Sequence, residues 1–573
     1  MYRENNAHKQ QAMFSDFGSL PEKLKKKIDA SWAGTFYREY FCRIDESIFE
    51  VLYSEEASRP NVPVNVLLGL ETMKAGFGWS DEEMHEAFSF NVQVRYALGY
   101  RHLSEGHFEL RTVYNFRARL REHMEQRGED LVEKAFEQIT DGQVEALELK
   151  TGKLRMDSTQ VASNIRQMSR LQLLVEVVRR MGRSLSEIDR GRYAKLLAPY
   201  VKGTSGQYVY QTRPGEKETR IVQVGRVMQR LVAELAEAYK EDEAYQTLAR
   251  VFDEHFVVTE NDLRAKEGQE ISAQSVQSPD DLDATYRKKR GEGYRGYVAN
   301  VTETCDPDNP VQLIVEVQVA PNATDDAQMM AEALPELKDR TDVEEIYTDG
   351  GYNGEAVDAA RETHPVKHIQ TAMRGGAPDP DRLHLVDFTL TTDADGEPLR
   401  IVCPNEVEAE VRPGRSPERY IARFPHKTCD SCPLVDKCPT QPRKRKRRGR
   451  VLYFSQQNLC AAERRQTLAQ YRAIAKQLRP AVEATVRSIK HPFRQGKLPV
   501  RGKPRVSMMI VGSAAMCNVR RLWRCAMEKK QAEMAQMKEE IALLSTSFSR
   551  FARRMRDFIF APSRSWRFAP VRG

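Results

Sequence analysis

Apolar residues recur at helical spacing through the first part of the chain. In the stretch PVNVLLGLETMKAGFGWSDEEMHEAF, large apolar side chains fall three or four positions apart: Val66, Leu70, Met73 and Phe77, then Met84 and Phe88. This period is typical of amphipathic helices, and GWSDEE supplies a break at which Ser80 can cap the second helix. A second unit, FELRTVYNFRARLREHMEQR, follows a turn at GYRHLSEGH. Residues 1–150 are therefore predicted to form an all-α N-terminal domain.

The later helix of this domain carries four arginines: Arg111, Arg117, Arg119 and Arg121. A helix, a turn and a basic helix could form a DNA reader. An ordinary helical bundle with a solvated basic face fits the same pattern, and both interpretations stay open.

The period changes near residue 153. KLRMDSTQVASNI alternates as a short strand would, with Asp157 at its polar step. GYVANVTETCDPDNPVQLIVEVQVAP predicts a hairpin with its turn at DPDNP, and DAQMMAEALPEL predicts an amphipathic helix. The next strand, in IYTDGGYNG, ends at Asp349 before two glycines. That carboxylate either caps the turn or holds a metal or a proton.

The order of these segments predicts a mixed α/β domain that is interrupted twice. Residues 166–285 are predicted to be an all-α insertion, and residues 376–450 carry clustered cysteines and end in RKRKRRGR. Helix returns at NLCAAERRQTLAQYRAIAKQLRPAVEATVRSIK. In the C-terminal tail, 526–573, Met and Leu at helical spacing predict packing or self-association and not a cofactor site.

Length and composition are those of a large multidomain globular protein. A chain of 573 residues is too long for one hydrophobic core, so several domains are expected. No apolar run reaches the length of about 18 residues that a membrane span needs, and the N-terminus MYRENNAHKQ lacks the apolar region of a signal peptide. We therefore expect a cytoplasmic protein without a membrane partner.

The charge is unevenly distributed. Residues 441–573 hold 32 Lys and Arg against 7 Asp and Glu, a net charge of +25, which leaves −18 for residues 1–440 out of the total of +7. A tail this basic is typical of proteins that meet nucleic acid, although a solvated basic face has the same composition. The run Arg443, Lys444, Arg445, Lys446, Arg447 and Arg448 is either a loop that grips phosphate or a solvated run.

Four of the nine cysteines lie within 36 residues: Cys403, Cys429, Cys432 and Cys438. Clustering of this kind in a cytoplasmic chain favours a structural metal over disulfides. Tetrahedral zinc takes four thiolates readily, so we predict a Zn²⁺ site in this insertion. His426 could replace one thiolate, and iron could occupy the same four ligands.

Arg479, Glu483 and Lys490 are four and seven positions apart. At about 100° per residue, eleven steps return to within about 20° of the start, so the three lie on one helical face. This face could be a plain ion-paired surface.

Together these motifs resemble DDE transposases of bacterial insertion sequences. Asp157 in RMDSTQV, Asp349 in YTDGGYNG and the helix R-x3-E-x6-K look like the catalytic signature of that family, in which Y-x2-R-x3-E-x6-K is common. Lys476 stands here in place of the tyrosine, which is an accessory group and not a metal ligand. The segments RPNVPVNVLLGLETMK, DATYRKKRGEGYRGYVANVTE and KPRVSMMIVGSAAMCNVRRL are also similar to this group, whereas residues 166–285 match it least well.

The resemblance implies an RNase H-like α/β core, a mixed sheet with flanking helices, formed by residues 151–165, 286–375 and 451–525. Asp157, Asp349 and Glu483 would then be catalytic ligands of two Mg²⁺ or Mn²⁺ ions, with Asp157 bridging both. Arg479, Lys490 and Arg487, together with the run 443–448, would contact DNA phosphate.

The expected function is to bind the ends of an insertion sequence in double-stranded DNA, cut phosphodiester bonds and join the 3′-hydroxyl to target DNA. The resemblance also implies a homodimer on DNA, associated with the nucleoid. Two alternatives stay open: an RNase H-like nuclease without strand transfer, and a catalytically silent DNA-binding relic.

Overall fold

A six-stranded mixed sheet lies at the centre of the molecule. The computed structural model describes residues 1–10, 15–54, 60–259, 262–289, 291–373, 379–393, 397–442 and 449–559. The long strand β5 (Glu292–Thr304) pairs on one side with β1 (Lys153–Ala162) and on the other with β4 (Thr285–Lys289) and β6 (Ile314–Pro321), all antiparallel. Beyond β1 follow β7 (Glu345–Thr348) and β8 (Lys367–Gln370), both parallel to it. This sheet agrees with the predicted mixed α/β class and the predicted hairpin.

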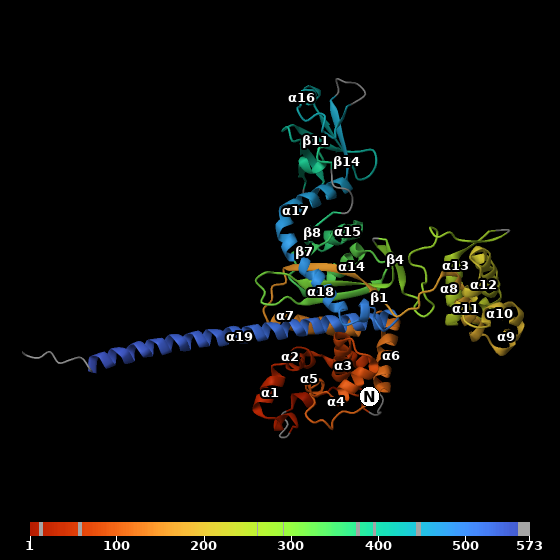
Figure 1. The fold of residues 1–573 in the computed structure, drawn as a ribbon. Helices are drawn as coiled ribbons and strands as arrows, with labels where there is room; N and C mark the ends of the chain where they lie inside the picture. Colours follow the sequence, from red (N-terminus) through yellow and green to blue (C-terminus); the bar gives the residue numbers. More distant parts are fainter. Residues whose placement is uncertain are drawn as a thin grey trace, which may run out of the picture.

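Helices cover both faces of this sheet (Figure 1). Successive side chains of β1 point to opposite faces. Leu154 and Met156 pack in a core with α14 (Asp326–Arg340) and α15 (Glu355–Thr363). Asp157 faces the other side, which α18 (Pro480–Lys490) and α19 (Lys503–Ile559) cover together with α17 (Gln456–Leu478). The alternation that predicted a strand thus also turns Asp157 toward α18.

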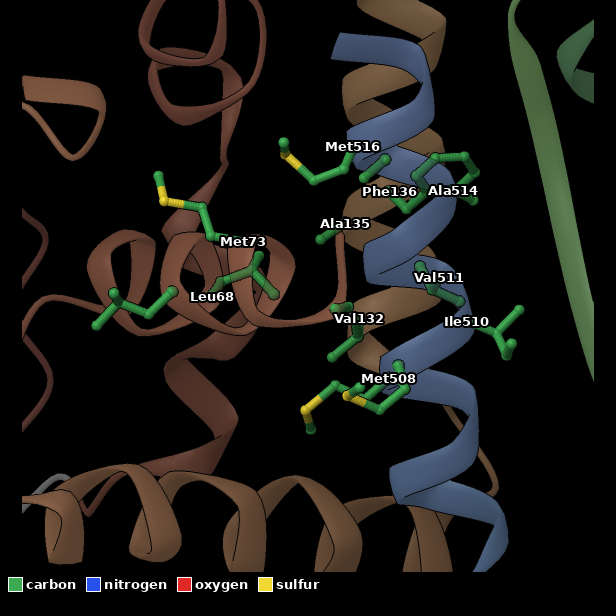
Figure 2. Packing of buried hydrophobic residues seen from close by; sticks show 14 of the residues in the cluster. Leu68, Met73, Val132, Ala135, Phe136, Met508, Ile510, Val511, Ala514 and Met516 are labelled. Carbon is green, nitrogen blue, oxygen red and sulfur yellow. The ribbon is translucent and has the colours of Figure 1, made fainter. Parts of the chain in front are cut away.

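The N-terminal residues form the predicted helical bundle. Its helices are α1 (Glu22–Asp29), α2 (Trp32–Glu39), α3 (Val64–Phe77), α4 (Asp81–Phe90), α5 (Val92–Ala97), α6 (Leu110–Arg127) and α7 (Leu131–Ala146). The predicted cap is present, because the Ser80 hydroxyl accepts from the backbone N–H of Glu83. α3 is buried along nearly its whole length and packs against α19, with α7 beside it (Figure 2).

Close contact between α3 and α19 depends on glycine. A Cβ atom on Gly76 would lie 2.2 Å from Cγ of Met516, and one on Gly512 would lie 3.0 Å from Cβ of Ala75. The same hydrophobic core includes residues of the sheet, among them Val301 and Val317. The bundle and one face of the sheet therefore share a core.

The insertion at 166–285 has a hydrophobic core of its own. It consists of α8 (Arg170–Ser184), α9 (Glu187–Arg192), α10 (Ala194–Val201), α11 (Ser205–Gln211), α12 (Lys217–Tyr239) and α13 (Glu243–His255). The prediction that it is all-α is wrong in one detail, because β2 (Phe256–Val258) and β3 (Leu263–Ala265) form a short hairpin after α13. These strands have three residues each, too few for a period-two pattern to stand out.

A second sheet fills the cysteine-bearing insertion. It contains β9 (Thr389–Thr392), β10 (Pro398–Val402), β11 (Glu408–Pro413), β12 (Arg419–Phe424), β13 (Gln441–Pro442) and β14 (Arg450–Ser455), in the order β13-β14-β12-β11-β10-β9. The short helix α16 (His426–Asp430) follows β12. The sequence analysis assigned no strands to this region.

The helix α19 extends from the body of the molecule (Figure 1). Its first part packs between the bundle and the sheet. There the Asn518 side chain accepts the backbone N–H of Ile314 at 2.9 Å and donates to the carbonyl of Ile314 at 2.8 Å. The helix runs without a break across the boundary expected between residues 525 and 526. The predicted C-terminal amphipathic helix is therefore the outer part of a longer one.

Candidate active site

The three acidic residues singled out in the sequence come from three separate elements. Asp157 lies in the middle of β1, Asp349 directly follows β7, and Glu483 lies in the first turn of α18. Because β1 and β7 are neighbouring parallel strands, both aspartates project near the same end of the sheet, where α18 crosses it.

The side chain of Arg479 lies among these three carboxylates. Its Nη1 donates to Oε1 of Glu483 at 2.8 Å, and its Nη2 donates to Oδ1 of Asp157 at 3.1 Å. Nη2 is also 3.8 Å from Oδ2 of Asp349. One guanidinium thus contacts all three carboxylates, which fixes their mutual proximity.

Arg479 is placed by the junction of two helices. α17 ends at Leu478 and α18 begins at Pro480, while Arg479 between them keeps helical dihedral angles of −67° and −40°. Proline is tolerated at the first helical position because its missing N–H has no partner there anyway. The junction brings Arg479 and Glu483, one helical turn apart, over β1.

Burial gives the site unusual electrostatics. Desolvation raises the pKa of Asp157 to about 6, and Arg479 opposes that rise while Asp349 and Glu483 add to it. Three carboxylates at close quarters repel one another unless a cation lies among them. In this structure Arg479 supplies that cation.

Both interpretations of Asp349 fit the local geometry. Its Oδ1 accepts the N–H of Gly351 at 2.6 Å, which is the capping role, while its side chain is 39 % exposed and faces Arg479. A Cβ on Gly351 would lie 2.6 Å from that oxygen and 2.9 Å from Oδ2 of Asp326. Glycine is therefore required for the turn to bring the backbone so close to two carboxylates.

The remaining residues predicted to contact DNA are distributed differently. Lys490 donates to the carbonyl of Gln160 at 3.3 Å, and burial lowers the pKa of its amine. Arg487 is exposed on α18, as is Lys476 on α17. The run Arg443 to Arg448 lies outside the described residues, so its predicted role stays a prediction.

On α6, Arg117 is part of the bundle. It donates to Glu71 at 2.8 Å and to both oxygens of Asp81, and its side chain is 11 % exposed. Arg119 lies over the ring of Tyr53. These contacts favour the ordinary bundle over a DNA reader for these two arginines.

The four clustered cysteines surround one small cavity in the second sheet. Cys403, Cys429, Cys432 and Cys438 all line this space of ≈ 30 Å³. Burial raises the pKa of the Cys429 thiol, and the other three cysteines add to that rise. His426 instead forms an ion pair with Asp430 at 2.5 Å and does not line the cavity. The geometry favours four thiols over a set that includes His426.

The donor atoms fit the metals that the sequence predicts, but they are not arranged as ligands. Mg²⁺ prefers carboxylate oxygens and Zn²⁺ accepts four thiolates. Within the described part of the chain, no group of three or more His, Cys, Asp or Glu could hold a metal ion as placed. At the carboxylates, the guanidinium of Arg479 lies within 3.8 Å of all three side chains.

Sequence reasoning missed a buried carboxylate behind this site. Glu303 on β5 is fully buried and accepts from Arg155 Nε at 2.6 Å, Arg521 Nη1 at 2.7 Å and Thr485 Oγ1 at 2.8 Å. Arg155 also donates to the carbonyl of Leu478. Glu303 thus joins β1, α18 and α19. Its partners Arg155 and Thr485 each lie two positions along the chain from Asp157 and Glu483, respectively. An acidic residue inside the apolar strand pattern was the available signal.

Asp326, at the start of α14, was missed as well. It is 4 % exposed, and its Oδ1 accepts from the Ser158 hydroxyl at 2.9 Å. The ring of Tyr352 is buried nearby, and burial together with Asp157, Asp326 and Asp349 raises the pKa of its hydroxyl well above the usual value. In the sequence, Asp326 looks like any acidic residue in the first turn of a helix, so no signal marks it as part of the site.

Two family models match separate parts of the chain. Residues 23–119 match the family model "Transposase domain (DUF772)", and residues 402–523 match "Transposase DDE domain". These two matches support an insertion-sequence DDE transposase. The second match includes Glu483, Arg479 and all four clustered cysteines, whereas Asp157 and Asp349 lie before it. No curated protein and no solved structure shows significant similarity to this chain.

A DDE transposase domain implies polynucleotidyl transfer or nuclease activity on DNA. Among the helices that the structure describes, none is both long and apolar enough to cross a bilayer.

Proposed function

We propose that this transposase binds the ends of an insertion sequence, cuts phosphodiester bonds and joins the freed 3′-hydroxyl to target DNA. The observation that carries the proposal is the approach of Asp157, Asp349 and Glu483 to one guanidinium, within 3.8 Å. The mixed sheet with helices on both faces supports an RNase H-like core. We keep the domain division given above, with the core formed by residues 151–165, 286–375 and 451–525.

Asp157, Asp349 and Glu483 would hold two Mg²⁺ or Mn²⁺ ions. When bound, two such ions activate a water or 3′-hydroxyl and stabilise the leaving oxygen. For the carboxylates to act as ligands, Arg479 gives up its three ion pairs. Its guanidinium is then free for bidentate contact with a DNA phosphate, and Lys490 and Arg487 add positive charge along the same helix.

A structural Zn²⁺ in the second sheet is part of the proposal. Its support is that Cys403, Cys429, Cys432 and Cys438 line one cavity, and four thiolates are a donor set that Zn²⁺ accepts. A homodimer on DNA, acting in the cytoplasm at the nucleoid, completes the proposal.

The test is cleavage of a labelled duplex that carries the sequence just outside this gene, with Mg²⁺. Wild type should nick and join at a defined end, whereas Asp349→Asn and Glu483→Gln should bind but stay inert. Asp308→Asn is the matched control, since Asp308 is a carboxylate in the same domain whose side chain is 70 % exposed.

The products separate the alternatives. A nick without a joined product favours a nuclease, and binding without any cut favours a DNA-binding relic. Cleavage that persists in excess chelator, or in both acidic variants, contradicts the proposed chemistry.

A further inference from the structure

Among the residues that the structure describes, the outer part of α19 is exposed over many turns. From Glu528 to Arg556 every residue is exposed (Figure 1). Helices in proteins are stabilised mainly by packing of an apolar face and not by intrinsic propensity. A helix of this length with apolar residues in water therefore lacks the interaction that would stabilise it.

From Met534 to Met555, all the large exposed apolar residues except Leu543 form a single narrow line. They are Met534, Met537, Ile541, Leu544, Phe548, Phe551 and Met555, with exposed fractions between 43 % and 73 %. The intervals between them alternate strictly between three and four residues. We call these seven residues the α19 seam.

This spacing distinguishes among the surfaces that could cover the seam. An apolar stripe that repeats at positions a and d of a heptad is the narrow seam of a coiled coil. A helix that packs on a globular domain, or lies on a lipid surface, has a wider apolar face. A seam of this kind is complementary to another helix with the same repeat.

We propose that the α19 seam binds the α19 seam of a second copy of this chain in a two-stranded coiled coil. Beside the seam, Glu533 and Lys538 would face each other across a parallel pair, while Glu540 and Arg554 would do so across an antiparallel pair. Each direction of pairing thus offers one complementary charge pair beside the seam.

The area that the seam can bury is close to that of a standard dimer interface. Seven exposed side chains of this size bury on the order of 100 Å² each, or roughly 700 Å² per chain. Standard protein interfaces bury about 800 Å² per partner. The seam alone thus approaches the size of a complete interface.

The inference deepens the homodimer included in the proposed function, but it rests on the helix alone. Its experiment contains neither DNA nor metal. A negative result would therefore leave the three-carboxylate chemistry intact, and a failed cleavage assay would leave the coiled coil intact.

The experiment measures the mass of the purified full chain by size-exclusion chromatography with light scattering. Wild type should have twice the chain mass of 65.7 kDa. Leu544→Asp should reduce this to one chain mass at the same concentration, because a buried unpaired carboxylate in the seam is costly.

The chain offers a matched control at the next position. Leu543 is 66 % exposed and Leu544 is 70 % exposed, but Leu543 lies off the seam. Leu543→Asp should therefore remain a dimer. Phe548→Asp and Ser549→Asp repeat the comparison one turn further along the helix.

A monomeric wild type at tens of micromolar would overturn the proposal. Equal effects of Leu543→Asp and Leu544→Asp, or no effect of Leu544→Asp and Phe548→Asp, would do the same. Circular dichroism of each variant shows whether the rest of the chain keeps its helices.

Discussion

Glu303 lies behind the candidate site and contacts none of its three acidic residues, but its loss should destabilise the elements that carry them. The change is Glu303→Ala, which removes the one carboxylate shared by Arg155, Arg521 and Thr485. Glu303 is fully buried, and the side chains of Arg155 and Arg521 are 8 % and 19 % exposed. Two arginines would remain in the interior without their counter-ion.

The expected cost follows from this burial. Breaking a buried ion pair by removing one partner typically costs about 3–5 kcal/mol. Arg155 keeps its bond to the carbonyl of Leu478, and Arg521 keeps its bond to the carbonyl of Gln312, so the lower end of that range is expected. Even about 3 kcal/mol is a large share of the roughly 5–15 kcal/mol that stabilises a typical protein.

Urea unfolding followed by tryptophan fluorescence measures this cost. Trp523 on α19 donates to the carbonyl of Ala30, and Trp32 and Trp79 lie in the bundle that shares its core with the sheet. The control is Asp308→Ala, which breaks an exposed ion pair with Lys150 and should cost far less, because water screens exposed pairs. If both variants lose the same small amount, the ion-pair network around Glu303 does not stabilise the junction of β1, α18 and α19.

Two other predictions concern residues outside the candidate active site. Burial raises the pKa of Glu316 well above its ordinary value, and burial raises that of Glu137 to about 8 against the opposing effect of Arg340. An acid with a raised folded-state pKa stabilises the fold at low pH, and this contribution is lost as pH rises through that pKa. Wild type should therefore become less stable between about pH 5 and pH 9, and Glu316→Gln should reduce this decline; thermal melts with parallel pH profiles would refute the assignment. At the cysteines, freshly purified wild type should contain about one equivalent of zinc by elemental analysis. Cys432→Ser should lose most of it and Cys460→Ser, which does not line the cavity, should not; a wild type without zinc or iron would contradict the proposed site.

The sequence by itself determined the elements whose pattern is local. The helical period of residues 64–90, the alternation around Asp157 and the hairpin at DPDNP all predict the structure found there, because side-chain direction repeats with the backbone geometry of each element. The spacing of Arg479 and Glu483 likewise fixes their adjacency on one helix. The second sheet was not predicted, although β12 alternates between buried and more exposed residues. The segment 376–450 was interpreted as a metal site, because of its clustered cysteines.

Only the tertiary structure decided how residues far apart in sequence meet. Asp157, Asp349 and Glu483 are separated by more than a hundred residues at each step, and no periodic pattern reports that distance. The sequence likewise predicted Arg479 as a phosphate contact, whereas the fold turns its guanidinium into the cation shared by three carboxylates. That choice is electrostatic: burial strengthens the repulsion among the carboxylates, and the guanidinium of Arg479, at the junction of α17 and α18, neutralises it.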